Sequence, residues 1–168
     1  MQRHDERLAH SLYYEDIELG RRFQTREHQV TDADLLRFSE LTHDHHPLHR
    51  DDDFARTMGF PRRIAHGLFG LALMEGLKSE LGLYETTSVA SIGWDEVRFR
   101  KAIVSGDRVH VRVVLESARR SNTKPGRGVV TEAVELVNQA GEVAISAKHA
   151  TLLITRDAAD AAAAAAGA

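Results

Sequence analysis

The chain of 168 residues contains no cysteine, which excludes disulfides, thiolate catalysis and cysteine-based zinc sites. It has no apolar run as long as a membrane span, and its first seven residues are polar where a secretory signal would be apolar. The net charge is only −3, so no overall basic field exists to hold nucleic acid or an anionic membrane. We therefore expect a soluble, cytoplasmic protein that binds neither nucleic acid nor membrane.

Helices are predicted in the first half of the chain. Thr31 is placed to cap a helix, and Asp34 completes a capping box with it. Residues 51–59 are typical of a short second helix, acidic at its start and closed by glycine. Residues 64–77 are apolar nearly all round, which indicates a buried helix. Each of its three glycines lowers helix stability by about 1 kcal/mol relative to alanine, so we expect a sheet or another helix to approach closely.

Strands are predicted mainly in the second half. Residues 109–115 alternate with a period of two, as a half-buried strand does. We assign Trp94 and Phe99 to the core. Further strands are expected at 23–30, 89–92, 94–99, 129–137 and 143–154, the last two joined as a hairpin.

Helices followed by antiparallel strands indicate an α+β fold in which a sheet wraps one central helix. The length suits one domain, which we place at residues 13–155. Residues 1–12 are expected to be a flexible segment. The alanine-rich residues 156–168 are expected to form a solvated tail, disordered or fraying as a helix.

The candidate site lies in residues 42–49, which hold four histidines and one aspartate and are interrupted by Pro47. Proline fixes its own φ and disfavours the α region for the preceding residue, so we expect a stiff turn. Such a turn could aim Asp44 and His49 at one point. A carboxylate and an imidazole aimed at one point can move protons at neutral pH.

Two other interpretations of this segment stay open. Asp44 could be an ordinary turn residue and His49 a structural imidazole. The cluster could also bind zinc or iron. A metal site is disfavoured because His45 and His46 are adjacent and should diverge, and because no helical His-x₃-His pair is present.

The motif Asp44-His45-His46-Pro47-Leu48-His49 resembles the D-x-N-P-L-H signature of the MaoC-like dehydratases, or (R)-specific enoyl-CoA hydratases. Residues 63–68, 93–99 and 105–107 also fit that family, and the resemblance covers residues 13–155. It implies the hot dog fold, an antiparallel sheet wrapped around a long central helix. It also implies a homodimer or dimer of dimers, with the acyl-thioester site in a tunnel at the subunit interface.

The resemblance implies reversible hydration of a trans-2-enoyl-CoA, or dehydration of an (R)-3-hydroxyacyl thioester, without cofactor or metal. Asp44 and His49 would be the catalytic pair, and the Gly67 N–H would hold the thioester oxygen. The chain departs from the family at two positions. His46 replaces the asparagine of the signature, and Glu75 stands where some members carry a serine.

The residues themselves suit this chemistry. Asp44 could deprotonate water if a dry pocket raised its pKa toward neutrality. His49 could orient the water and pass a proton to C2 of the substrate. Gly67 begins the buried helix, whose free N–H groups and dipole favour negative charge on a nearby oxygen.

Four further residues are candidates for substrate binding. Arg62 and Arg63 lie next to the Gly67 segment and could receive the phosphates of coenzyme A. His66 could shape the tunnel mouth, although packing is an equal alternative. His46 could affect substrate orientation, although it could also be solvated or structural.

Two competing functions remain. Hot dog proteins also hydrolyse acyl-CoA, so the chain could be a thioesterase. It could instead be a non-catalytic acyl-thioester-binding subunit that completes a partner's site in a heteromeric dehydratase. The presence of both Asp44 and His49 argues against each alternative.

Overall fold

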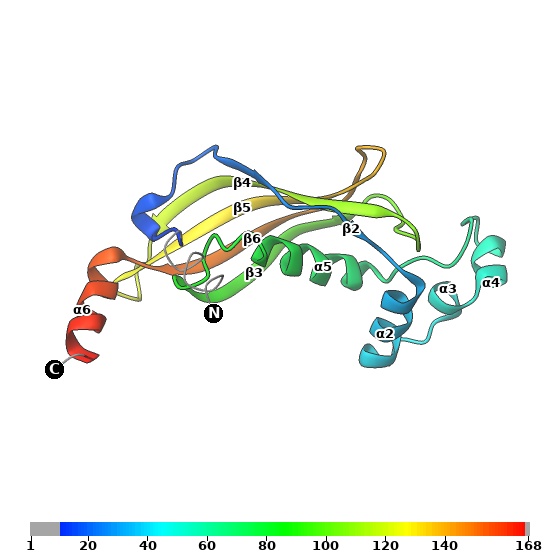
Figure 1. The fold of residues 1–168 in the computed structure, drawn as a ribbon, viewed down its shortest axis with the longest axis horizontal. Coiled ribbons are helices and arrows are strands. Elements are labelled where there is room, and N and C mark those ends of the chain that lie inside the picture. Colours follow the sequence, from blue (N-terminus) through cyan, green and yellow to red (C-terminus); the bar gives the residue numbers. More distant parts are fainter. Residues whose placement is uncertain (1–10, 167–168) are drawn as a thin grey trace.

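The computed structural model describes residues 11–166. An antiparallel sheet arches over helix α5 (Gly67–Ser79), and three shorter helices gather at one end of it (Figure 1). The strands run in the order β1-β4-β5-β6-β3, and β2 also pairs with β4. The α+β arrangement expected from the sequence, a sheet around one central helix, is therefore confirmed.

The strands are β1 (Arg22–Gln24), β2 (His28–Gln29), β3 (Ser88–Phe99), β4 (Arg108–Arg120), β5 (Arg127–Asn138) and β6 (Val143–Ile154). The remaining helices are η1 (Tyr14–Asp16), α2 (Asp32–Thr42), α3 (Pro47–Arg50), α4 (Asp52–Thr57) and α6 (Arg156–Ala166). Within residues 11–166, no helix has both the length and the apolar character needed to cross a membrane.

The period of two in β4 follows from its two different faces. Val109, Val111, Val113 and Leu115 are fully buried and face the core, while His110 and Arg112 between them are more exposed. The hairpin of β5 and β6 forms as expected, with Val137 opposite Val143.

Two strand predictions differ in their boundaries. The separate strands expected at 89–92 and 94–99 are one continuous strand, β3. The single strand expected at 23–30 is divided into β1 and β2. The division occurs at Thr25, whose hydroxyl accepts a hydrogen bond from the Val111 N–H at 2.9 Å in place of a backbone carbonyl.

The capping box predicted for α2 is present. The Thr31 hydroxyl accepts from the Asp34 N–H at 3.2 Å, and the Asp34 carboxylate accepts from the Thr31 N–H at 2.9 Å. The Asp51 carboxylate caps α4 by accepting from the N–H groups of Asp53 and Phe54, so side chains satisfy backbone donors at both helix starts. The caps position the segment between α2 and α4, which carries the candidate site.

The glycines of α5 explain how the helix can lie against the sheet. A Cβ atom on Gly70 would overlap the Ile145 side chain of β6, and one on Gly67 would lie 2.8 Å from the Phe99 ring of β3. Gly76, in contrast, faces open space. Close approach of the sheet therefore accounts for Gly67 and Gly70, as expected, but not for Gly76.

The chain ends differ in part from expectation. Residues 1–10 of the predicted flexible segment lie outside the described residues. Leu12 is not free, because its N–H donates to the Leu83 carbonyl and its own carbonyl accepts from Thr87. Residues 156–166 form helix α6, which corresponds to the helical alternative for the tail and not to the disordered one. A run of alanines has the highest intrinsic helix propensity, which explains the difference.

We predict opposite effects for two substitutions in α5. Gly70→Ala should lower the free energy of unfolding by about 1–3 kcal/mol, because the new methyl group overpacks against Ile145. Gly76→Ala should raise it by up to about 1 kcal/mol, because alanine is the better helix former and meets no neighbour. Urea unfolding of both variants measures the difference, and equal effects would contradict the packing argument.

Candidate active site

The candidate site begins where α2 ends. His43 takes the left-handed conformation, with a φ of 59°, and so stops the helix. The Ser39 hydroxyl then donates to the Asp44 carbonyl at 2.7 Å and fixes the turn. Pro47 occupies the first position of α3, where its missing N–H costs nothing. The turn is therefore constrained on both sides, and His49 lies within the short helix that follows it.

His46 has a clear local role in this turn. Its Nδ1 accepts a hydrogen bond from the Leu48 N–H at 3.2 Å and caps α3. Its own N–H donates to Asp44 Oδ1 at 3.2 Å and orients that carboxylate. An asparagine side chain could accept the same hydrogen bond from Leu48, which explains how histidine can replace it here.

Asp44, His49 and His66 converge although 22 residues separate the first from the last. Each offers one ligand atom, and these atoms all lie within 4.8 Å of one another. The His66 ring stacks on the His49 ring at 3.7 Å between centroids. His66 Nε2 donates to the Asp44 carbonyl at 3.0 Å and lies 3.7 Å from the Asp44 carboxylate. The buried His66 thus holds both of the other residues in place.

The hydrogen bond of His49 defines its tautomer. Its Nδ1 lies 2.9 Å from the Ile64 carbonyl, which can only accept, so Nδ1 carries the hydrogen. Burial lowers the pKa of His49, and the neighbouring His66 adds to this effect. The ring is therefore neutral at pH 7, and Nε2 holds the free lone pair.

The condition set for Asp44, a pKa raised by a dry pocket, is not met in the single chain. The hydrogen bond from the His46 N–H lowers the pKa of the Asp44 carboxyl, and the surrounding histidines lower it further. The side chain is 53% exposed, so the isolated chain does not enclose it in the dry pocket that we expected. Asp44 is thus an ionised hydrogen-bond acceptor at neutral pH.

A cavity of about 500 Å³ adjoins His49 and the start of α5. His49, His66 and Gly67 line it, and Gly67 is the first residue of the helix, so its N–H has no intrahelical partner. Most of the remaining wall is apolar: Phe60, Ile64, Ala65, Leu68, Phe99, Ala102, Ile103 and Ile145. An apolar cavity with few polar groups at one end is typical of a small-molecule site.

Phe99 and two basic residues in this wall were not predicted. Phe99 is 55% exposed and borders the cavity, so its assignment to the core is wrong. Arg100 and Lys101 follow it in the same wall. No local pattern marks these residues, because the turn after β3 reaches Gly67 only through the tertiary fold.

Arg62 and Arg63 do not line this cavity. Arg63 forms an ion pair with Asp32 at 2.8 Å, and Arg62 donates to the Ser105 carbonyl at 3.2 Å. Both side chains therefore join α2 and neighbouring loops to the segment before α5. Glu75 lies two turns along α5 from Gly67 and faces a different cavity.

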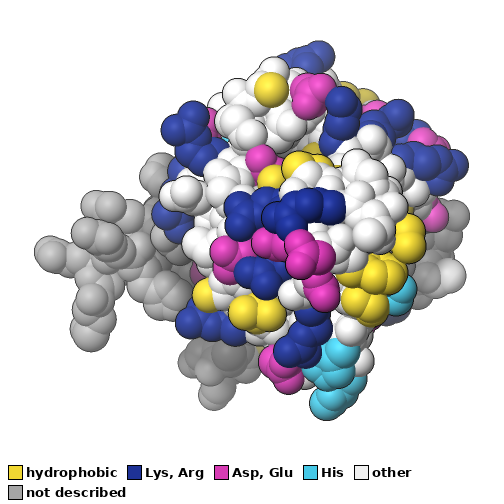
Figure 2. All heavy atoms as spheres, turned by 90° about the vertical axis from the view of Figure 1, so that its right-hand side faces the viewer, with side chains coloured by type: hydrophobic (Ala, Val, Ile, Leu, Met, Phe, Trp, Pro, Cys, Tyr) yellow, Lys and Arg dark blue, Asp and Glu magenta, His cyan; other side chains and the backbone are white. Residues whose placement is uncertain are grey.

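Figure 2, which views the end of the molecule that carries α2–α4, shows histidines gathered at one edge beside a hydrophobic patch. Exposed apolar residues near the cavity include Leu68, at 65% exposure, and Phe99. Clusters of exposed apolar side chains commonly mark contact surfaces. The mouth of the candidate site therefore borders a surface suited to a further contact.

The set Asp44, His49 and His66 contains donor types that bind zinc or iron. A histidine binds a metal through the in-plane lone pair of one ring nitrogen. The two rings here stack at an interplanar angle of 28°, so their lone pairs run nearly side by side and converge poorly on one ion. The geometry favours proton transfer over metal binding.

A curved antiparallel sheet around a central helix, with a polar turn at the start of that helix, defines a hot dog protein, and similar solved structures have this fold. The chain matches the MaoC-like domain family over residues 16–138, and it belongs to that family.

The individual relatives are about 30% identical to this chain over the aligned residues. It is 30% identical over 104 residues to protein MaoC of Klebsiella aerogenes, and 32% identical over 102 residues to 3-hydroxybutyryl-CoA dehydratase of Methylorubrum extorquens. These alignments cover 62% and 61% of this chain, but only 30% and 62% of the two relatives. Among solved structures, the MaoC-like dehydratase from Rhodospirillum rubrum matches with a TM-score of 0.78 and 27% sequence identity. The match covers 87% of this chain and 99% of that one.

We predict that His46 can be replaced by asparagine but not by alanine. The asparagine side chain would still accept from the Leu48 N–H, so His46→Asn should change the free energy of unfolding by no more than about a few tenths of a kcal/mol. His46→Ala should lower it by about 0.5–2 kcal/mol, because the cap is lost. Thermal or urea unfolding distinguishes the two, and equal losses would show that the ring does not act as a cap.

Proposed function

We propose that the protein catalyses reversible addition of water to a trans-2-enoyl-CoA. The reverse reaction is dehydration of an (R)-3-hydroxyacyl thioester. The observation that carries this proposal is the meeting of Asp44 and His49, within 4.8 Å, beside an apolar cavity that also contains the N–H of Gly67. Membership of the MaoC-like domain family and similarity to a 3-hydroxybutyryl-CoA dehydratase support it.

The water would bind between two acceptors, the Asp44 carboxylate and His49 Nε2. One ligand atom of each residue lies within 4.8 Å of the other, a range that a water molecule can bridge because each hydrogen bond measures about 2.8 Å. As the water oxygen bonds to C3 of the substrate, His49 Nε2 accepts its proton. The ionised Asp44 stabilises the imidazolium that forms.

The second half of the reaction needs a stabilised enolate and a proton at C2. Negative charge develops on the thioester oxygen, and the Gly67 N–H at the start of α5 would donate to it. The enolate then collapses as the His49 imidazolium returns the proton to C2. One water is added across the double bond, and every group of the protein recovers its starting protonation state.

Coenzyme A carries phosphates, for which the structure offers two groups of basic residues. Arg100 and Lys101 belong to the cavity wall and are the better candidates. Arg62 and Arg63 remain alternative candidates, although they are already bonded to Asp32 and to Ser105. The scheme uses no cofactor. A cytoplasmic location and the absence of a nucleic-acid partner remain predictions from the sequence.

We also propose a homodimer formed through β3. This strand lies at one edge of the sheet, so its outer backbone groups are available for pairing with another strand. Its apolar side chains Val89, Ile92 and Phe99 are about half exposed. A second copy would cover these side chains and the nearby mouth of the cavity. A dimer of dimers would build on the same contact.

We predict that Asp44→Asn and His49→Ala each lower kcat/KM for enoyl-CoA hydration by about 10²–10⁴-fold, the usual contribution of acid–base catalysis. Loss of the ultraviolet absorbance of crotonyl-CoA measures the rate. His43→Asn is the matched control, because His43 is exposed and asparagine tolerates its positive φ. Unchanged turnover in both variants would refute the assignment.

Two further assays on the same purified protein distinguish the competing functions. Release of free thiol from acyl-CoA, detected with a disulfide dye, would indicate a thioesterase. Ligand binding without turnover, restored by a co-purified partner, would indicate a non-catalytic subunit.

We predict that hydration activity is lost on the acid side of neutrality. The reaction requires neutral His49, whose pKa burial lowers from its ordinary value of 6.5. As the pH falls through that lowered pKa, the ring gains a proton and kcat/KM falls, whereas Asp44 stays ionised because its own pKa is also lowered. A pH profile of kcat/KM should therefore be flat near pH 7 and decline only below 6.5. A decline that begins above pH 7 would contradict this protonation scheme.

A further inference from the structure

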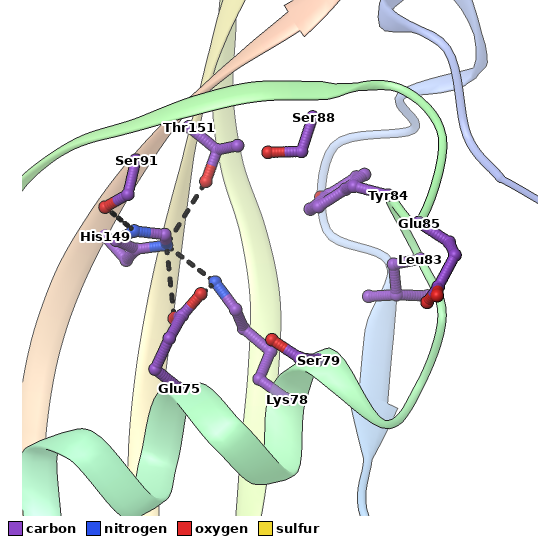
Figure 3. Close-up of a pocket in the computed structure, with 10 residues that line it drawn as sticks. All are labelled: Glu75, Lys78, Ser79, Leu83, Tyr84, Glu85, Ser88, Ser91, His149 and Thr151. Atoms are coloured by element: carbon purple, nitrogen blue, oxygen red, sulfur yellow. Dashed lines mark hydrogen bonds and ion pairs between the residues drawn. The ribbon is translucent and has the colours of Figure 1, made fainter.

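Two histidine side chains are buried in the described part of the chain, His66 at the start of α5 and His149 on β6. They differ in how many hydrogen bonds their rings form. His149 lies beside a second cavity, of about 290 Å³, at the far end of α5 (Figure 3). Its Nδ1 lies 2.6 Å from Lys78 Nζ and its Nε2 lies 2.7 Å from the Ser91 hydroxyl. Both ring nitrogens of His149 therefore have partners, which explains how this ring can be buried.

The His66 ring forms only one hydrogen bond. Its Nε2–H donates to the Asp44 carbonyl at 3.0 Å, whereas its Nδ1 is buried and finds no hydrogen-bond partner among the described residues. A ring nitrogen without a partner in a core is destabilising, and an apolar ring of similar shape would avoid that cost. The stability of the fold therefore does not explain a histidine at this position.

Capping of α5 does not explain this histidine either. His66 occupies the N-cap position of α5, as His46 does for α3. The His46 ring accepts from the Leu48 N–H, whereas the His66 side chain forms no capping hydrogen bond. Only the backbone carbonyl of His66 takes part in the helix, by accepting from the Gly70 N–H at 3.3 Å. The His66 side chain can therefore be replaced without removing a bond from α5.

The His66 ring instead contacts both members of the proposed catalytic pair. Besides its hydrogen bond to the Asp44 carbonyl, Nε2 lies 3.7 Å from the Asp44 carboxylate. The ring stacks on the His49 ring at 3.7 Å between centroids, with an interplanar angle of 28°. The Phe38 ring of α2 lies 5.2 Å from it and adds a further aromatic contact. His66 is thus a rigid spacer that touches Asp44 through one atom and His49 through its face.

We propose that His66 is a positioning residue, which fixes the Asp44 carboxylate and the His49 ring at the distance and angle at which both bind one water. The inference rests on the proposed function. The hydrogen bond places the backbone of Asp44, and the stack sets the plane of the His49 ring. A displacement of about 1 Å at a reacting centre can lower the rate about 100-fold, so a buried residue that prevents it outweighs its cost in stability.

His66→Phe distinguishes positioning from stabilisation. The phenyl ring keeps the contact with His49 but cannot donate to the Asp44 carbonyl, which still accepts from the Ser39 hydroxyl. We expect kcat for crotonyl-CoA hydration to fall about 10- to 100-fold. The urea midpoint of unfolding should stay the same or rise, because the unpartnered Nδ1 is gone. His66→Gln, whose amide can still donate to that carbonyl, should recover part of the lost rate.

A double variant tests whether His66 acts through His49. If it does, His66→Phe should cause no further loss of rate in a chain that already carries His49→Ala, because the group that it positions has been removed. Phe69→Leu is the control for packing. Phe69 contacts Phe38 at 5.6 Å between ring centroids but does not line the cavity at His49. This variant should lower the urea midpoint and leave kcat unchanged.

Nuclear magnetic resonance of the histidine side chains in the ¹⁵N-labelled protein gives a readout that needs no activity. The titratable groups that act on His49 are Asp44 and His46 in the turn and His66 in α5. Burial is the main cause that lowers the pKa of His49, and His66 lowers it further. His66→Phe should therefore raise the pKa of His49 toward 6.5, and the acid limb of the kcat/KM profile should move to higher pH with it. Phe69→Leu should leave both unchanged.

Four results would overturn the proposal: full activity of His66→Phe, a loss of stability in that variant as large as in Phe69→Leu, additive losses in the double variant, or an unchanged pKa of His49. Failure of the proposed function is recognised separately. In that case the unaltered protein would not hydrate crotonyl-CoA, while the pKa of His49 could still be measured in it and in both variants.

Discussion

The contact between α5 and the inner face of the sheet is the constraint on which the rest of the structure depends. Gly70 lets the helix backbone lie directly against Ile145 of β6, where any larger side chain would overlap. This contact fixes the start of α5, and with it the N–H of Gly67 beside His49. It also fixes the end of the helix, where Lys78 reaches Glu132. Because protein cores are close-packed, a shift of the helix would disturb both ends together.

The two ends of α5 differ in whether the charged side chains beside them are exposed or buried. At the start, the charged group, Asp44, stays half exposed and accepts one backbone hydrogen bond, from His46, while the half-buried His49 and the buried His66 beside it are imidazoles. At the end, charges are buried outright, and Glu132 stays ionised despite burial because the Lys78 ammonium and the Tyr84 hydroxyl donate to it and lower its pKa. Proton transfer, as proposed for the first end, needs groups that can change protonation, whereas the buried cluster at the second end joins α5 to β5 and β6.

The sequence predicts well those features that depend on neighbours along the chain. The cap at Thr31, the alternation of β4 and the turn at Pro47 each arise from contacts within a few residues. The convergence of Asp44 and His49 belongs to the same group, since five residues and one proline separate them. The family resemblance added Gly67 to this predicted site, although no local sequence pattern connects Gly67 to His49.

Contacts between distant segments could not be predicted. Lys78, Glu132 and His149 come from α5, β5 and β6, and each alone resembles an ordinary surface residue in the sequence. Arg100 and Lys101 reach the first cavity only because β3 ends beside α5. The shift in the pKa of Asp44 could not be predicted either, because its direction depends on the exposure of the side chain and on one backbone hydrogen bond.

The exposure of Asp44 connects the chemistry to the proposed dimer. An ionised carboxylate in contact with bulk water is a weak base, and a dry environment would raise its pKa and strengthen its interaction with an imidazolium. In the single chain one side of the turn is open, and the nearby apolar residues Leu68 and Phe99 are also uncovered. A second copy bound along β3 would exclude water from both. The proposed dimer contact would therefore dry the surroundings of the proposed catalytic pair, Asp44 and His49, and cover the apolar side chains beside them.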